Sequence, residues 1–184
     1  RALQDLAVDD TTLKYIYRSA LHRPQNVWIQ TAALELLVTL SWSSFEQALP
    51  QRLQQRGTGD DLFVRRRAVQ LLARYFHRLN GAEDLIPHVL ADPSPFVRQV
   101  LPKVLVHAPL KTALLALEQL LTRDASPQVR AATWLEWPDL LANPQFRHEA
   151  VSLFRQLAGQ EKDDFVIRVI CLVAERSTEQ LRRN

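Results

Sequence analysis

The sequence predicts an all-α fold, an α-solenoid of about five stacked helix pairs with about ten helices. A short unit recurs five times: a helix-capping Asn, Asp or Ser, then a Val or Ile three residues later, then a Gln or Arg. We call the Val or Ile the marker. The markers are Ile29, Val64, Val97, Val129 and Ile167, at intervals of 35, 33, 32 and 38 residues. Self-similarity at such a period is typical of stacked repeats, which bury a core only together.

The composition supports the same fold class. Hydrophobic residues make up 47% of the 184 residues and there are only 4 Gly, which leaves ample core material and little turn chemistry for a β fold. The single Cys excludes an internal disulfide framework and favours a reducing compartment, so we expect a cytoplasmic protein. No apolar run approaches the roughly 20 residues of a bilayer span, which predicts no membrane insertion.

Each repeat divides into two amphipathic helices. In the second repeat, residues 4, 7, 8 and 11 positions after Val64 share its helical face and are apolar or aromatic. Capping and proline signals begin a preceding helix in each repeat. The predicted repeats are approximately 10–41, 43–79, 81–108, 109–142 and 144–181, in one domain over 1–184. Because the chain begins at Arg1 and contains no Met, we expect a fragment of a longer protein.

The turn residues carry a family resemblance. Asp92 precedes Arg98 by six residues and Asp124 precedes Arg130 by six, and this pattern resembles HEAT repeats over almost the whole chain. The resemblance implies a right-handed superhelix in which these Asp and Arg side chains form a ladder that links successive repeats. The first copy departs from the pattern, with Gln30 in place of Arg. The implied ladder residues are Asp60, Arg65, Asp92, Arg98, Asp124, Arg130, Asp163 and Arg168.

Support for catalysis is thin, and we expect no enzyme activity and no cofactor. The chain has no Gly-rich phosphate loop and no Gly-x-Ser-x-Gly elbow. Cys171 falls four residues after the last marker, a core position, which predicts a buried thiol. The five His residues are scattered without a pair at ligand spacing, so we expect no metal site.

The positive charge is concentrated in one stretch. Residues 51–80 contain seven Arg against Asp60 and Asp61, whereas the flanking stretches are nearly neutral. In HEAT-like proteins the second helices line the concave side, so residues opposite their core stripe would face a partner. The binding candidates on this side are Arg66, Arg67, Gln70, Arg74 and His77 in the second repeat, and Gln99 and Lys103 in the third.

The fourth repeat is irregular. Trp134 and Trp137 stand within four residues, and Pro138 is expected to stop the helix early. One interpretation is a bend packed with Trp side chains. The other is an aromatic binding spot, since Trp is frequent at interface hot spots. Pro102 predicts a kink in the third repeat.

These observations lead to a functional expectation with alternatives. We expect a non-catalytic scaffold or regulatory domain that binds another protein, or another segment of its parent chain, through the concave helical face. One alternative is a nucleic-acid-binding solenoid similar to the HEAT-like DNA glycosylases, because Arg side chains could track phosphates. Asp60 and Asp61 beside the Arg cluster argue against nucleic acid, so a solvated helix face or a surface for an acidic protein partner is favoured instead. A third is an accessory domain of a larger enzyme, similar to the helical superhelices of some metallo-aminopeptidases.

Overall fold

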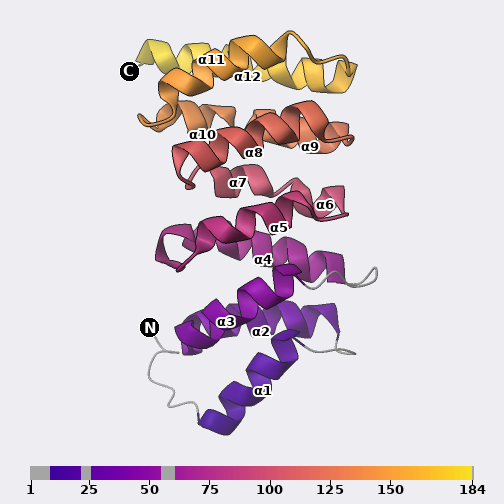
Figure 1. The fold of residues 1–184 in the computed structure, drawn as a ribbon, viewed down its shortest axis with the longest axis vertical. Helices are drawn as coiled ribbons and strands as arrows, with labels where there is room; N and C mark the ends of the chain where they lie inside the picture. Colours follow the sequence, from indigo (N-terminus) through magenta and orange to yellow (C-terminus); the bar gives the residue numbers. More distant parts are fainter. Residues whose placement is uncertain (1–8, 22–25, 55–60, 184) are drawn as a thin grey trace. The chain divides into compact units, whose positions relative to one another are not determined.

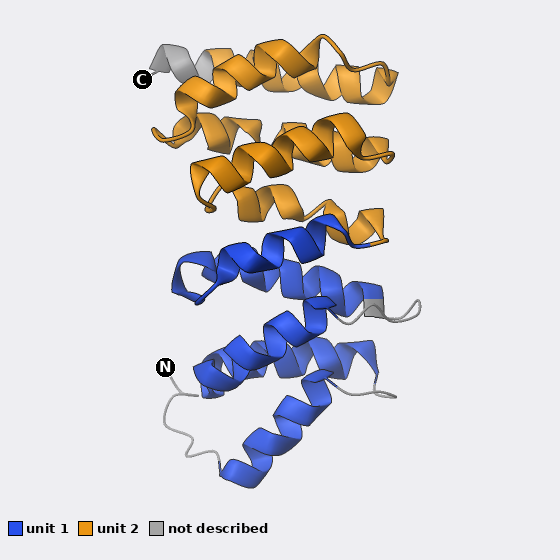
Figure 2. Cartoon of the chain, in the orientation of Figure 1, with its two compact units in different colours: residues 1–92 blue, residues 93–184 orange. Residues whose placement is uncertain are grey.

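The regular structure of the chain is entirely helical. The computed structural model describes residues 9–21, 26–54 and 61–183, and these ranges contain no β-strand (Figure 1). The predicted all-α class is therefore confirmed. Among the described helices, none is long and apolar enough to cross a bilayer. The chain divides into two compact units, residues 1–92 and 93–184 (Figure 2), and a single domain over 1–184 stays a prediction.

Unit 1 is built around two adjoining long helices, α2 and α4. α2 packs against α1, α3 and α4, and α3 packs in turn against α1, α4 and α5. The second helices of the first two predicted repeats, α2 and α4, therefore lie in direct contact. The elements are α1 (Asp10–Leu21), α2 (Val27–Leu40), α3 (Trp42–Gln54), α4 (Asp61–Tyr75), the 3-10 helices η1 (Phe76–Arg78) and η2 (Ala82–Leu85), and α5 (Ile86–Leu90).

Unit 2 repeats this arrangement around α9. α9 contacts α6, α7, α8 and α12, and α10 contacts α11 and α12. Second helices again lie against second helices, because α6 and α7 pack on α9 and α9 packs on α12. The elements are α6 (Pro95–Arg98), α7 (Leu101–Leu105), α8 (Leu110–Arg123), α9 (Pro127–Leu135), α10 (Trp137–Ala142), α11 (Arg147–Ala158) and α12 (Asp164–Arg183).

Prolines explain the broken helices. A proline ring clashes with the carbonyl four residues earlier and removes a backbone donor. Four residues before Pro102 is Arg98, the residue at which α6 ends, and α9 ends at Leu135, three residues before Pro138. The interruption predicted at Pro102 and the early end of the helix predicted before Pro138 are both present. With α6–α7 and α9–α10 each counted as one broken helix, the described helices agree with the expected number of about ten.

Capping side chains begin several second helices. Asn26 Oδ1 accepts from the Trp28 amide at 2.8 Å before α2, and Ser126 Oγ accepts from the Val129 amide at 3.4 Å before α9. Both bonds satisfy first-turn amides that the helix itself leaves free. Ser94 stands at the equivalent place before α6 without making the cap hydrogen bond.

The last repeat is one residue out of the predicted register. Asp163, not Asp164, caps α12, since its Oδ1 accepts from the amides of Phe165 and Val166 at 3.0 and 3.2 Å. The residue three positions after this cap is Val166, which is 0% exposed, whereas the predicted marker Ile167 is 37% exposed. The prediction of Ile167 as the marker was therefore wrong, and Val166 takes its place beside the buried Val64, Val97 and Val129.

The same shift corrects the prediction for the cysteine. Cys171 is exposed rather than buried. Four residues after the true marker stands Ile170, and this side chain occupies the core position that we had assigned to the thiol.

The corrected register predicts opposite sensitivities for two adjacent residues. Val166→Ala should lower the free energy of unfolding by about 2 kcal/mol, because it removes two fully buried methyl groups and leaves a cavity. Ile167→Ala removes a larger but exposed side chain and should change it by less than about 0.5 kcal/mol. Urea unfolding of dilute protein measures both values. A larger loss for Ile167→Ala than for Val166→Ala would contradict the register.

Candidate interaction surface

Three arginines of the second helices bind carboxylates in the turn that precedes the next second helix. Arg65, directly after the marker of α4, donates from Nε to Asp92 Oδ2 at 2.7 Å, and both side chains are buried. Arg98 makes a two-pronged bond to Asp124, with Nε–Oδ2 at 2.7 Å and Nη2–Oδ1 at 2.9 Å. Two parallel N–H···O bonds of this kind are among the stronger and more directional ion pairs.

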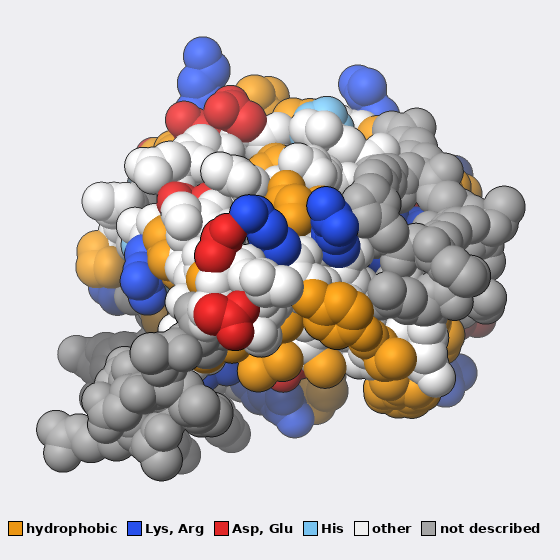
Figure 3. Space-filling view, turned by 90° about the horizontal axis from the view of Figure 1, so that it is seen from below, with side chains coloured by type: hydrophobic (Ala, Val, Ile, Leu, Met, Phe, Trp, Pro, Cys, Tyr) orange, Lys and Arg blue, Asp and Glu red, His pale blue; other side chains and the backbone are white. Residues whose placement is uncertain are grey.

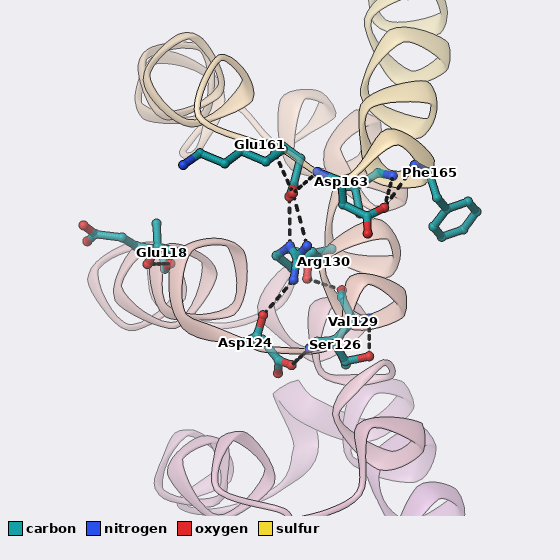
Figure 4. Close-up of polar contacts among 12 residues, drawn as sticks. Glu118, Asp124, Ser126, Val129, Arg130, Glu161, Asp163 and Phe165 are labelled. Atoms are coloured by element: carbon teal, nitrogen blue, oxygen red, sulfur yellow. Dashed lines mark hydrogen bonds and ion pairs between the residues drawn. The ribbon is translucent and has the colours of Figure 1, made fainter.

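Arg130 extends the series to the last repeat. Its Nε and Nη2 donate to Glu161 at 2.8 and 3.1 Å, and its Nη1 donates to the backbone carbonyl of Asp124 at 2.9 Å. In Figure 4 the guanidinium lies between the two turns that carry these acceptors. Arg130 therefore joins two turns of unit 2. Beside this pair is an open hollow of about 230 Å³.

The Arg130–Glu161 pair holds both groups in their charged forms. The hydrogen bond to Glu161 raises the pKa of the Arg130 guanidinium, against the opposing effect of burial. Burial acts to raise the pKa of Glu161, but hydrogen bonds from Arg130 and from the backbone amides of Asp163 and Lys162 outweigh it and lower that pKa. The Glu161 carboxylate thus accepts hydrogen bonds from Arg130 of α9 and from two backbone amides of its own turn.

Several predicted ladder residues lie elsewhere. Asp163 caps α12, and Glu161 takes the carboxylate position that we had assigned to it. Arg168 is exposed and makes no ion pair with the part of the chain described here, because Ile167 stands directly after the true marker. Asp60 lies outside the described residues. Glu161 was missed because the predicted pattern required Asp and its register was one residue off; counted from Val166, Glu161 stands five residues before the marker, as Asp92 and Asp124 do before theirs.

The first repeat replaces the ion pair with a hydrogen bond between a charged guanidinium and a neutral amide. Gln30, which stands where later copies have Arg, is buried and accepts a hydrogen bond at Oε1 from Arg52 Nη2 of α3. Arg52 is itself buried. In the later copies the residue after the marker donates a hydrogen bond, whereas Gln30 accepts one from Arg52. Sequence reasoning missed this role because Arg52 belongs to no repeated motif.

The basic surface of unit 1 is partly neutralised. Arg67 pairs with Glu35 of α2 at 2.6 Å, and its Nη1 donates to Gln70 at 2.9 Å. Arg67 therefore links α4 to α2, and Gln70 accepts a hydrogen bond from it within α4. Arg66 is half-buried, and burial lowers its pKa. Arg74 is exposed, with its guanidinium 5.4 Å from the centre of the Tyr75 ring, and His77 is also exposed.

The unit 2 candidates carry less charge. Lys103 of α7 is exposed and lies 3.8 Å from Glu136, which follows α9. Burial is the main cause that raises the pKa of this half-buried carboxyl, while Lys103 acts to lower it. Gln99 is half-buried between α6 and α7. The cation of Lys103 is thus offset by a carboxylate of its own unit.

The two tryptophans form a packed core, not a binding spot. Trp134 and Trp137 are buried, with their ring centres 4.8 Å apart, and Phe154 of α11 packs edge-on against Trp134 at 5.2 Å. A partner cannot reach either ring, so their prediction as binding residues was wrong. The alternative interpretation, a bend packed with Trp side chains, is what the structure contains between α9 and α10.

Neither metal chemistry nor a known relative identifies the site. The described residues include no group of three or more His, Cys, Asp or Glu side chains that could hold a metal ion. No protein-family model, curated protein or solved structure matches the chain. Arguments about function therefore rest on the exposed side chains of the second helices.

The ladder predicts a large difference between two arginines. Arg130→Ala should cost about 2–3 kcal/mol of stability, because it removes the charged hydrogen bonds to Glu161 and leaves that carboxylate with only the backbone amides of Lys162 and Asp163. Arg168→Ala, at an exposed position of α12, should cost less than about 0.5 kcal/mol. Urea denaturation followed by circular dichroism gives both values, and equal losses would refute the assignment of Arg130 to the ladder.

The lowered pKa of Glu161 predicts acid sensitivity. Its contribution to stability is complete above the ordinary pKa of 4.5 and is lost as the pH falls through the lower value of the folded state. The thermal midpoint of the wild-type protein should therefore be higher than that of Glu161→Gln, and the difference should be largest at about pH 6. This difference should narrow towards about pH 3. A gap that stays constant over this range, measured by calorimetry, would show that the charge of Glu161 contributes nothing.

Proposed function

We propose that this chain is a HEAT-like, right-handed α-solenoid domain that acts as a non-catalytic scaffold and binds an acidic segment of a partner protein. The binding surface would be the exposed side of its second helices. The ladder-like pairs Arg65–Asp92, Arg98–Asp124 and Arg130–Glu161 support the architectural part of this proposal. Two of the three pairs, Arg65–Asp92 and Arg98–Asp124, join residues that the resemblance to HEAT repeats implies as ladder residues, and this supports the proposal.

One observation carries the functional part. Arg74 of α4 and His77 of η1 are exposed, and half-buried Arg66 lies about two turns before Arg74 on α4. Arg67 lies among them but binds Glu35 and Gln70, which leaves Arg74 as the cation best placed for an outside carboxylate. An anionic partner fits this surface by charge.

An acidic protein segment suits the surface better than a nucleic acid. Phosphate tracking needs several cations in a row, and each contact contributes to a steep salt dependence. Here Arg65 and Arg67 are already paired with Asp92 and Glu35, and Lys103 lies near Glu136. Few cations remain to follow a phosphate backbone.

The proposal can be tested by peptide selection. Peptides selected from a random display library against the protein should be enriched in Asp and Glu. Fluorescence anisotropy should show binding of the best peptide weakened at least about tenfold by the double variant Arg66→Glu/Arg74→Glu, since each reversal replaces attraction by repulsion. Arg168→Glu, an exposed Arg on another second helix, is the matched control and should leave affinity unchanged.

Two results would count against the proposal. Selected peptides without acidic enrichment, or affinity unaffected by the double variant, would remove this surface from consideration. Micromolar binding of a random DNA duplex that falls steeply between about 50 and 200 mM salt would favour the nucleic-acid alternative.

A further inference from the structure

Two exposed arginines at the end of α4 lie over aromatic rings. The guanidinium carbon of Arg78 is 3.9 Å from the centre of the Trp42 ring, and that of Arg74 is 5.4 Å from the centre of the Tyr75 ring. Both distances fall within the reach of a cation–π contact. Arg74 belongs to the last turn of α4 and Arg78 ends the adjoining η1, so their side chains leave the backbone about one helical turn apart.

The rings beneath these arginines belong to one cluster. The ring centres of Trp42 and Tyr75 are 5.7 Å apart in an edge-to-face arrangement. Phe45, which is fully buried in unit 1, packs against Trp42 at 5.2 Å and against Tyr75 at 6.1 Å. Because Phe45 anchors the cluster in the core, the two guanidiniums share one firm aromatic support.

The backbone that follows Arg78 is held as well. The Leu79 amide donates to the Tyr75 carbonyl at 3.1 Å. Asn80 donates from its backbone N and from Nδ2 to Glu46 Oε1 of α3, at 3.3 and 3.1 Å. Arg78 therefore needs little further ordering to bind an anion, which keeps the entropic cost of binding small.

The two arginines differ from several other cations of unit 1, which have carboxylates beside them. Lys14 of α1 pairs with Asp10 one turn earlier, and Arg67 pairs with a carboxylate of α2. Figure 3, which views this end of unit 1 from below, shows Lys and Arg side chains next to Asp and Glu side chains. Within the part of the chain that the structure describes, Arg74 and Arg78 form no ion pair. Their N–H groups are therefore available to an outside anion.

A phosphate group suits two such guanidiniums better than a carboxylate does. A carboxylate has two oxygens, and one guanidinium can bind both of them. A phosphorylated serine or threonine carries close to two negative charges near pH 7 and has three acceptor oxygens, so it can bind both arginines at once. Two cations match one doubly charged group, whereas a nucleic-acid backbone needs a longer row.

We propose that Arg74 and Arg78 bind a phosphorylated serine or threonine of a partner protein. This inference rests on the proposed function, because it specifies the acidic segment as one that carries a phosphate. The aromatic cluster holds the guanidiniums in place, and the phosphate oxygens accept hydrogen bonds from both, as in other phosphopeptide sites built from arginines. Arg78 and Trp42, which were not among the sequence-derived candidates, thereby join the binding surface.

Retention of peptide libraries tests the proposal. Two random peptide libraries that differ only in a fixed central residue, phosphoserine or serine, are applied to the immobilised protein. The phosphoserine library should be retained at least about tenfold better, because the phosphate adds charge-assisted hydrogen bonds to two arginines. Arg74→Gln and Arg78→Gln should each remove most of this preference. Arg123→Gln, at an exposed arginine of α8, is the matched control and should leave it unchanged.

Two further variants separate geometry from charge. Arg78→Lys keeps the charge but lacks the planar pair of donors, so it should lose most of the preference for phosphoserine. Trp42→Leu keeps Arg78 but removes the ring beneath it, and should lower the preference about two- to fivefold. Circular dichroism checks that the fold of each variant is intact, and the exposed position of Arg78 makes its variants the decisive ones.

Three results would overturn the proposal: equal retention of the two libraries, a preference that survives Arg78→Gln, or displacement of the phosphoserine peptides by random DNA that itself binds Arg78→Gln more weakly. The last result would assign the site to nucleic-acid phosphates. Acidic peptides that bind without any preference for phosphoserine would refute this inference and leave the proposed function standing. An arginine-dependent preference for phosphoserine, without binding of unphosphorylated acidic peptides, would support this site and refute the broader acidic-segment proposal.

Discussion

A cap three residues before a fully buried valine sets the register on which the other interactions depend. The cap fixes where a second helix begins, and a helix places its fourth residue at a defined angle from its first. Once the valine is buried, the next residue points towards the following turn. There it is Arg65, Arg98 or Arg130, and each finds a carboxylate. The ion pairs thus follow from the position of an apolar side chain. Where the cap moves by one residue, at Asp163, an apolar Ile167 takes the arginine's place.

The fold could be predicted largely because its signals are local and repeated. Marker spacing, helix periodicity and the two prolines each depend on residues within a turn or two, so an all-helical chain and the interruptions near Arg98 and Leu135 follow from the sequence alone. The last register could not be predicted, because Asp163 and Asp164 are both good caps and Val166 and Ile167 are both good core residues. Only burial decides between such pairs, and burial depends on the packing of α12 against α9.

The candidate surface was harder to predict than the fold because pairing is not a local property. Arg65, Arg66 and Arg67 are adjacent and identical in type, yet the first pairs with buried Asp92, the second is half-buried and the third reaches Glu35 on another helix. Helical geometry separates them by about 100° per residue, which sends each guanidinium to a different environment. The family resemblance identified Arg65 as structural, but Glu35 and Glu161 stand outside its motif. For Trp134 and Trp137, residue type favoured an interface, whereas their position beside Phe154 made them core.

The contacts between second helices depend on the same constraint. In these junctions, a charge six residues after the marker and an Arg directly after it make each contact specific to its neighbour, because a mismatched pair would leave a buried charge. On α12 the residue after the marker is Ile167, which cannot form such an ion pair, so the series of arginine–carboxylate contacts does not continue from this helix.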